Sequence, residues 1–190
     1  MTHRKPNMAQ VPSVNAPYGR DFRGLWRVPS NYKLVGIDAS GLELRMLAHY
    51  MQDKEYTNEI INGDVHTANQ RLAGLESRNQ AKTFIYALIY GAGDEKLGSV
   101  AGGGRKAGKR LRKSFFDNLP TFTTLKDKVS RASTRGYLKG LDGRKLFVRS
   151  EHSALNTLLQ GAGAIVMKKA LVIFNEAIKD MDAHFVCNVH

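Results

Sequence analysis

Asp38 stands at the end of a short apolar run, a position typical of a metal-binding carboxylate. Residues 33–37 predict a buried strand that ends at Asp38. A carboxylate held at the rim of a sheet can bind magnesium against substrate phosphates, as nucleotidyl transfer requires. Glu43 lies five residues further on, early in a predicted helix. Taken alone, helix capping by Asp38 or Ser40 is the commoner explanation of this pattern.

A second set of residues recurs every four positions. Arg78, Lys82, Tyr86 and Tyr90 form a stripe on a predicted helix, drifting by roughly 40° per step. The stripe runs from two cations to two aromatic rings, as a nucleoside triphosphate runs from phosphates to a stackable base. An exposed cationic face with tyrosines at its edge is the alternative explanation.

A third set is polar and surrounds a predicted hairpin and the helix after it. It comprises Arg144, Arg149, His152, Asn156 and Gln160, of which the last three recur every four residues. Neutral donors on one face suit the minor groove of DNA, where the acceptors are nearly the same for every base pair. Buried amides that tie a helix to a loop would give the same pattern equally often.

A glycine-rich segment follows the first half of the chain. Residues 103–109 match G-x-x-x-x-G-K, the start of a phosphate-binding P-loop. Arg110 stands where magnesium binding needs Ser or Thr, and no predicted strand precedes the cluster. We therefore reject a P-loop ATPase and expect a flexible basic loop that binds a phosphate backbone.

The positive charge is concentrated in one stretch. Residues 101–150 hold 14 of the 29 Lys and Arg residues but 3 of the 17 acidic residues, so they carry nearly all of the net charge of +12. Such a block predicts a polyanionic partner, most often nucleic acid. A solvated helix face with a charged hairpin is about as common.

Helical periodicity dominates the elements that must position these residues. Residues 1–32 read as extended chain with turns, and a hairpin at 137–149 turns at Asp142-Gly143. Strands are predicted at 33–37 and 184–190. Helices are predicted at 42–51, 56–61, 65–72 with Asp64 as N-cap, 77–90, 105–118, 122–133 and 153–179. The pattern predicts an α+β fold, with strands from distant parts of the sequence meeting in one sheet.

Composition excludes several classes of protein. The 190 residues are 42% hydrophobic, enough for a core, and Cys187 alone cannot form a disulfide framework. We find no signal peptide and no uninterrupted apolar run long enough to span a bilayer, so we expect a cytoplasmic protein with no membrane contact.

Several segments, in order, resemble the family A (DNA polymerase I-like) DNA polymerases, especially the replicative polymerases of short-tailed bacteriophages. They are GIDASGLELR (36–45), RNQAKTFIYALIYGAG (78–93), GLDGRK (140–145), ALNTLLQGAGA (154–164) and, near the start, PNMAQVP (6–12). The resemblance covers nearly the whole chain. Four ordered motifs at matching spacings are far more specific than any one of them.

The resemblance implies mainly helical polymerase fingers with part of an antiparallel palm sheet. Residues 1–53 and 136–190 would be palm, and 54–135 fingers. The implied reaction is template-directed nucleotidyl transfer from a dNTP to a primer 3′-hydroxyl, with two Mg²⁺ ions as cofactors. The implied partners are primer-template DNA and dNTPs, in a host-cell cytoplasm if a bacteriophage encodes the chain.

The resemblance also implies roles for individual residues. Asp38 would be catalytic and would bind the metal. The nucleotide would be bound by Arg78, Lys82, Tyr86, His66 and Glu43. DNA would be bound by Tyr90, Arg149, His152, Asn156, Gln160, Asn7, Gln10 and His190.

One departure from the family concerns the second catalytic carboxylate, which is expected directly after His190 and is absent from this sequence. We expect this chain alone to be inactive, with a missing C-terminal segment or a complementary polymerase chain supplying that carboxylate. A non-catalytic, basic nucleic-acid-binding protein derived from a polymerase is the alternative.

Overall fold

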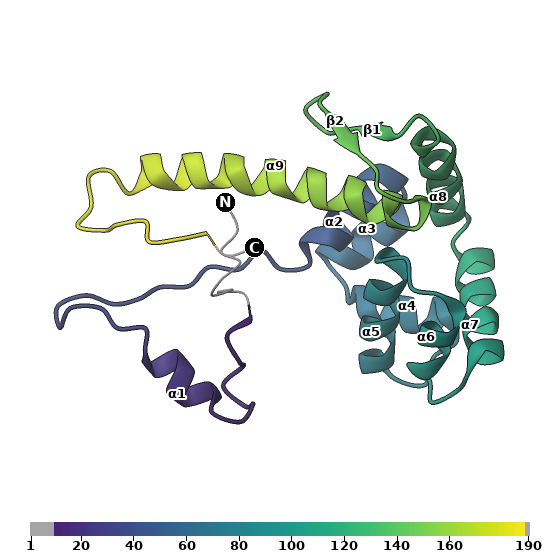
Figure 1. Cartoon of the computed structure of the whole chain (residues 1–190), viewed down its shortest axis with the longest axis horizontal. Coiled ribbons are helices and arrows are strands. Elements are labelled where there is room, and N and C mark those ends of the chain that lie inside the picture. Colours follow the sequence, from purple (N-terminus) through teal and green to yellow (C-terminus); the bar gives the residue numbers. More distant parts are fainter. Residues whose placement is uncertain (1–9, 189–190) are drawn as a thin grey trace. The chain divides into compact units, whose positions relative to one another are not determined.

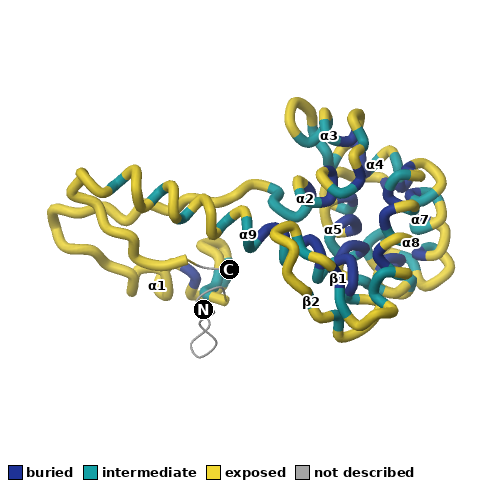
Figure 2. The backbone as a smooth tube through the Cα atoms, turned by 90° about the horizontal axis from the view of Figure 1, so that it is seen from above, coloured by how far each residue is buried: buried dark blue, intermediate teal, exposed yellow. Residues whose placement is uncertain are grey.

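The computed structural model describes residues 10–188, which fall into two compact units. Gly41–Leu171 form the larger unit, and residues 10–40 with 172–188 form the smaller one. Figure 2 shows buried positions gathered in the helices of the larger unit, whereas residues 10–40 are almost entirely exposed. The core that positions a site therefore lies in the larger unit.

The larger unit is a succession of helices joined by short turns (Figure 1). Its helices are α2 (Leu42–Met51), α3 (Lys54–Ile61), α4 (Val65–Ala73), α5 (Arg78–Ile89), α6 (Asp94–Ser99), α7 (Arg105–Asn118) and α8 (Pro120–Ser133). A hairpin of β1 (Tyr137–Lys139) and β2 (Lys145–Phe147) follows, and a 3-10 turn (Glu151–Ser153) leads into α9 (Ala154–Ala177). Each predicted helix is confirmed to within two residues at either end, and α6 is the addition.

Three phenylalanine rings form the centre of the core. Phe84 of α5, Phe115 of α7 and Phe122 of α8 are almost completely buried. The Phe115 ring meets Phe84 edge-on at 5.7 Å between centroids and Phe122 at 5.3 Å. Edge-on contacts add about 0.5–1.5 kcal/mol each beyond the burial of apolar area. The cluster therefore joins three helices that are separate in the sequence.

Side-chain caps define where several helices begin. Asp64 accepts a hydrogen bond from the backbone N–H of His66 and caps α4, as predicted. Ser77 caps α5 in a reciprocal capping box with Gln80. Asp53 caps α3 and also accepts a hydrogen bond from Thr121 at 2.8 Å, which ties α3 to the start of α8.

The glycine-rich segment is explained by backbone packing. A Cβ atom on Gly98 of α6 would lie 2.0 Å from the carbonyl oxygen of Gly104, and one on Gly108 of α7 would lie 1.8 Å from that of Asp94. Real side chains do not tolerate such distances, so the two helices approach through glycines. Gly104 is the N-cap of α7, so the predicted flexible loop is in large part helix.

The predicted hairpin is confirmed. Tyr137 pairs with Phe147 and Leu138 with Leu146 in an antiparallel register. Gly143 has φ of +83°, a backbone conformation that glycine adopts at least cost. The predicted α+β class is thus confirmed as a mainly helical chain with a small antiparallel sheet.

The predicted strand at 33–37 is wrong. Residues 31–39 adopt no regular secondary structure, and the side chains of Leu34, Val35 and Ile37 are 56%, 77% and 77% exposed. A strand needs a neighbouring strand for its backbone N–H and C=O groups, and within residues 10–40 none forms. Residues 10–32 also differ from expectation, because they contain the short helix α1 (Gly19–Gly24).

The predicted strand at 184–190 is wrong over the part that the structure describes. Residues 184–188 are irregular, and Phe185 and Val186 are exposed. Contacts between the two segments of the smaller unit run through side chains instead: the Tyr32 hydroxyl donates to Asp182 Oδ1 at 3.0 Å. The backbone of residues 184–188 forms no ladder of hydrogen bonds with a neighbouring strand among the described residues.

Helix α9 is unusually apolar. By length and composition alone the segment Glu151–Ala177 could cross a membrane, which the sequence did not predict. Its first turns are instead part of the core, where Ala154, Leu158, Leu159 and Ala162 are buried. One such helix is a weak indication of a membrane span.

Replacing Gly108 with alanine should destabilise the larger unit by about 1–3 kcal/mol, because the new methyl group overlaps the Asp94 carbonyl. Urea unfolding followed by circular dichroism measures the change. Gly93→Ala is the matched control, since no heavy atom lies within 4 Å of its Cβ position, and it should shift stability by less than about 0.5 kcal/mol. Equal losses in the two variants would contradict the packing explanation.

Candidate functional site

Helix α5 presents two faces of opposite character. Ala81, Phe84, Ile85, Leu88 and Ile89 are buried in the core. The other face carries exposed Arg78 and Lys82 and half-buried Tyr86. The predicted stripe is therefore confirmed as a surface feature. Its cations lie near the N-terminal end of the helix, where backbone N–H groups add positive potential.

Arg78 is held by a carboxylate in this structure. Its Nε and Nη2 atoms donate to Asp64 Oδ2 at 2.5 Å and Oδ1 at 3.1 Å. These hydrogen bonds, helped by one from Thr67, hold the pKa of the Asp64 carboxyl well below its usual range. An anionic ligand of Arg78 has to replace this carboxylate or share the guanidinium with it.

His66 lies beside this ion pair and faces the same side as Tyr86. The two rings are 6.3 Å apart. Burial lowers the pKa of His66, and the positive charges of Arg78 and Lys82 lower it further against the opposing effect of Asp64. Its Nδ1 atom is buried with no hydrogen-bond partner among the described residues. An imidazole in this setting can accept a proton when an anion arrives.

Three predicted residues from distant segments meet at the other end of α5. Gln160 of α9 donates from Nε2 to Glu43 Oε1 of α2 at 3.1 Å and to the Tyr90 hydroxyl at 2.9 Å. The Tyr90 hydroxyl lies 3.5 Å from Glu43 Oε1. Burial and the nearby Glu43 carboxylate raise the pKa of Tyr90. The arrangement fixes a carboxylate, a phenol and an amide side by side.

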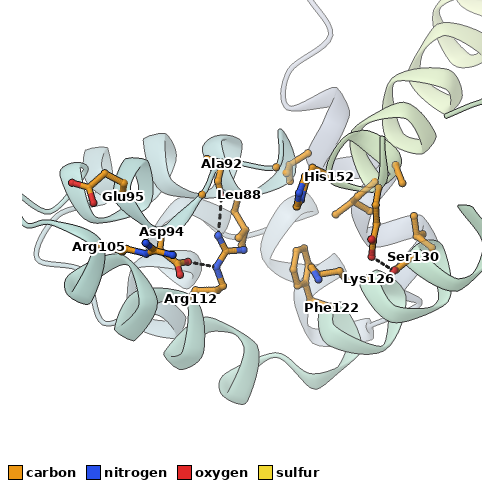
Figure 3. Close-up of a pocket in the computed structure, with 17 residues that line it drawn as sticks. Leu88, Ala92, Asp94, Glu95, Arg105, Arg112, Phe122, Lys126, Ser130 and His152 are labelled. Atoms are coloured by element: carbon orange, nitrogen blue, oxygen red, sulfur yellow. Dashed lines mark hydrogen bonds and ion pairs between the residues drawn. The ribbon is translucent and has the colours of Figure 1, made fainter. Parts of the chain in front are cut away.

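An open cleft of about 790 Å³ is lined by the end of α5, the turn that follows it and the start of α9 (Figure 3). Its floor is apolar, with Leu88, Phe122 and Leu155, and its wall carries the pair Arg112–Asp94. The Arg112 guanidinium donates to Asp94 at 2.7 Å and to the Ala92 carbonyl at 2.7 Å. The sequence analysis did not predict the Arg112–Asp94 pair, because the two residues are 18 positions apart and no local pattern connects them.

Two predicted contacts lie at the cleft and the start of α9. His152 lines the cleft from the 3-10 turn before α9. Its carbonyl oxygen lies close to Gly91, and a Cβ atom on Gly91 would be only 2.4 Å from that oxygen. Asn156 follows in α9, with its Oδ1 atom buried and without a hydrogen-bond partner in the described chain. Arg149 is exposed just before the turn.

The remaining predicted site residues belong to the smaller unit or lie outside the described residues. Asp38 and Gln10 are exposed in the smaller unit, and Asn7 and His190 lie outside the described residues. Across the described chain no group of three or more His, Cys, Asp or Glu side chains gathers as a metal site would require. The residues at hand therefore do not fit a complete magnesium site.

Comparisons with known proteins connect this geometry to one family. A family model described as DNA polymerase family A matches residues 1–190. The DNA-directed DNA polymerases of Enterobacteria phage T3 and Escherichia phage T7 are each 43% identical to this chain over 203 residues. Each alignment covers 93% of this chain and 29% of the polymerase, so the chain spans less than a third of the length of these relatives.

Bacterial proteins and a solved structure agree with this result. DNA polymerase I of Pseudomonas aeruginosa is 27% identical over 97% of this chain and 23% of its own length. The structure titled "POL domain of Pol1 from M. smegmatis complex with DNA primer-template and dNTP" has a TM-score of 0.78, at 24% identity. It covers 94% of this chain and 35% of that chain, and the likeness is one of fold.

His66 should report anion binding directly. We expect its imidazole to titrate below the ordinary value of 6.5, because burial and two cations disfavour the charged form. Pyrophosphate bound at Arg78 and Lys82 should raise that midpoint, so pyrophosphate should bind more tightly as the pH falls toward 6. NMR titration of His66 with and without pyrophosphate measures both effects, and His66→Gln identifies the resonance. A midpoint unmoved at saturating pyrophosphate would place the anion elsewhere.

Proposed function

The chain belongs to DNA polymerase family A, as its motifs predict, and we propose that it forms the palm-and-fingers part of a DNA-directed DNA polymerase. Residues 54–135 are the fingers, and 1–53 with 136–190 the palm. The polymerase transfers a nucleotidyl group from a dNTP to a primer 3′-hydroxyl on a template. Its setting is the cytoplasm of a bacterial cell, the host if a bacteriophage encodes it.

The exposed face of α5 is the observation that carries the proposal. Arg78, Lys82 and His66 offer positive or protonatable groups at one end, and Tyr86 offers a ring one turn beyond Lys82. This is the layout of a nucleoside triphosphate, with phosphates at the cations and the sugar and base near the ring. The spacing alone allowed an unspecialised cationic face, but the buried, unpartnered Nδ1 of His66 favours a binding site.

The two cations have different tasks in this proposal. Lys82 makes no ion pair within residues 10–188, so it is available to meet the triphosphate first. Arg78 is already paired with Asp64 and has to exchange one anionic partner for another. Binding of the triphosphate to Arg78 is therefore less favourable than binding to an unpaired cation. The ion pair with Asp64 is lost when the new ion pair forms. Lys82 is thus the larger contributor to initial affinity.

The group of Glu43, Tyr90 and Gln160 supports a role beside the sugar and the new base pair. We propose that Glu43 closes the space under the sugar and that Tyr90 lies near the templating base. Gln160, Asn156, His152 and Arg149 then contact DNA. Gln160 already bonds both Glu43 and Tyr90, so a change in one of the three positions affects the other two.

Asp38 is proposed as one carboxylate ligand of the two Mg²⁺ ions of the complete polymerase. When bound, these ions activate the primer hydroxyl and stabilise the charge that develops on the phosphates. Within the described residues Asp38 is not part of a group of three or more His, Cys, Asp or Glu side chains. A complementary polymerase chain, or further residues of a longer protein, completes the site in this proposal.

We expect the 190-residue chain on its own not to extend a primed template, because two metal ions need several ligands and no group of three or more His, Cys, Asp or Glu side chains gathers among its described residues. A gel-based extension assay with labelled primer, Mg²⁺ and all four dNTPs tests this. Asp38→Ala is the control for contaminating polymerase. Extension by the wild-type chain that disappears in this variant would show that the chain holds a complete site.

Nucleotide-dependent binding to DNA tests the proposed function itself. We expect the chain to bind a fluorescent, dideoxy-terminated primer-template several-fold more tightly with the matched dNTP than with a mismatched one. Lys82→Ala should abolish this difference, since the lysine contacts the triphosphate, whereas Lys128→Ala, an exposed lysine of α8, should retain it. Fluorescence anisotropy gives the affinities. Binding of the wild-type chain that ignores the nucleotide would favour the non-catalytic nucleic-acid-binding alternative.

A further inference from the structure

Helix α7 carries four cations on the side that faces away from the core. Gly108, Leu111 and Phe115 are buried on its inner side. The outer face consists of Lys106, Lys109, Arg110 and Lys113, all exposed. At about 100° per residue these four fall within roughly 100° of arc, opposite the buried positions. The outer face of α7 is therefore a continuous basic surface.

This basic surface is poorly neutralised by the chain itself. Lys113 pairs with Asp117 at 2.5 Å, whereas Lys106, Lys109 and Arg110 make no ion pair in the described part of the chain. The first turn of α7 contains no acidic residue, and Gly104 offers no capping side chain. Cations at the positive end of a helix lower its stability, so this arrangement is unfavourable until an anion covers it.

The basic surface is separate from the nucleotide site. Helices α5 and α7 meet through their inner sides, where Phe84 and Phe115 are in contact. On α5, Lys82 and its neighbours project from the side opposite Phe84. Helix α7 lies at the edge of the larger unit in Figure 1, and helical spacing places its cations on the side opposite Phe115. One dNTP cannot reach both faces.

The side chains of this surface point to a duplex backbone as the partner. Single-stranded nucleic acid is usually bound with the help of exposed aromatic rings that stack on bases. Sequence reading in a groove needs amides or other side chains that reach base edges. The outer face of α7 offers neither and presents long, flexible cations, with Asp117 as the carboxylate at its C-terminal end. It spans about 10 Å along the helix, or roughly three phosphate steps of one duplex strand.

We propose that the outer face of α7 binds the phosphate backbone of double-stranded DNA without sequence preference, at a place distinct from the primer-template at the nucleotide site. The contact is electrostatic and requires neither a primer end nor a dNTP. It deepens the proposed function, since a polymerase encounters duplex on more than one side. It also gives a role to Lys109, the lysine in the G-x-x-x-x-G-K match that was rejected as a P-loop.

The test uses the full chain and a blunt, fluorescent 20-base-pair duplex without dNTP. Replacing Lys106, Lys109, Arg110 and Lys113 with glutamine should weaken binding at least tenfold at about 0.1 M salt. Because each phosphate contact contributes about 0.9 to the slope of log affinity against log salt, the slope should become shallower by about 2–4. Circular dichroism checks that α7 stays helical.

The matched control removes the same charge elsewhere. Lys54, Lys128, Arg131 and Lys139 are exposed on other elements, and their replacement by glutamine should change affinity by less than threefold. If both variants lost the same affinity for the duplex, the loss would be explained by net charge alone, and the proposal would be overturned. Binding of a single strand or of a poly-glutamate peptide as tight as that of the duplex would also overturn it.

The proposal can fail independently of the proposed function. The α7 variant should still discriminate a matched from a mismatched dNTP on primer-template, because Lys82 is intact. Loss of that discrimination in the α7 variant would show that the two faces form one site, which contradicts this inference. A second result would separate the two proposals in the other direction. If matched dNTP did not change the affinity of the wild-type chain for primer-template, but the α7 variant still bound duplex more weakly, the proposed function would be wrong and the duplex-binding role of α7 would be supported.

Discussion

The contact of Phe84, Phe115 and Phe122 sets the direction in which the functional side chains of α5 and α7 point. Because α5 and α7 bury their apolar sides against each other, their polar sides face different parts of the solvent. The face of α5 that carries Arg78 and Lys82 and the outer face of α7 are both consequences of this single cluster. A helix that lost its place in the cluster would lose the orientation of its cations as well, since helix propensity alone does not fix rotation about the axis.

Electrostatic compensation organises the rest of the site. Asp64 serves two partners, because it caps α4 through the N–H of His66 and neutralises Arg78. The capping bonds hold its carboxylate in place whether or not the guanidinium stays bound. Arg112 and Asp94 form a comparable pair at the cleft, with both side chains about three-quarters buried. Arg78 and Arg112 are thus held by carboxylates of this chain, whereas Lys106, Lys109 and Arg110 of α7 make no ion pair with the described residues.

Local signals made the helices predictable, and non-local partners made the strands unpredictable. A helix such as α4 satisfies its own backbone, so periodicity and an N-cap at Asp64 sufficed to place it. Residues 33–37 include apolar Leu34, Val35 and Ile37, but no strand among the described residues pairs with them to complete their backbone hydrogen bonding. Helix α6 escaped prediction because six residues are too short for a periodic signal. The site was predicted one segment at a time, but the bonds of Gln160 with Glu43 and Tyr90 join positions 117 and 70 residues apart, which no local pattern reveals.

The approach of α6 to α7 through Gly98 and Gly108 has a mechanical consequence. Side chains can absorb a small shift between two helices by changing rotamer, but backbone packed on backbone has no such reserve. We therefore expect the two helices to keep their relative position. Helix α7 carries both the basic outer face and Arg112, and α6 begins with Asp94, so the pair Arg112–Asp94 at the cleft joins the same two helices. A displacement of the outer face of α7 would then also displace Arg112 and Asp94 at the cleft.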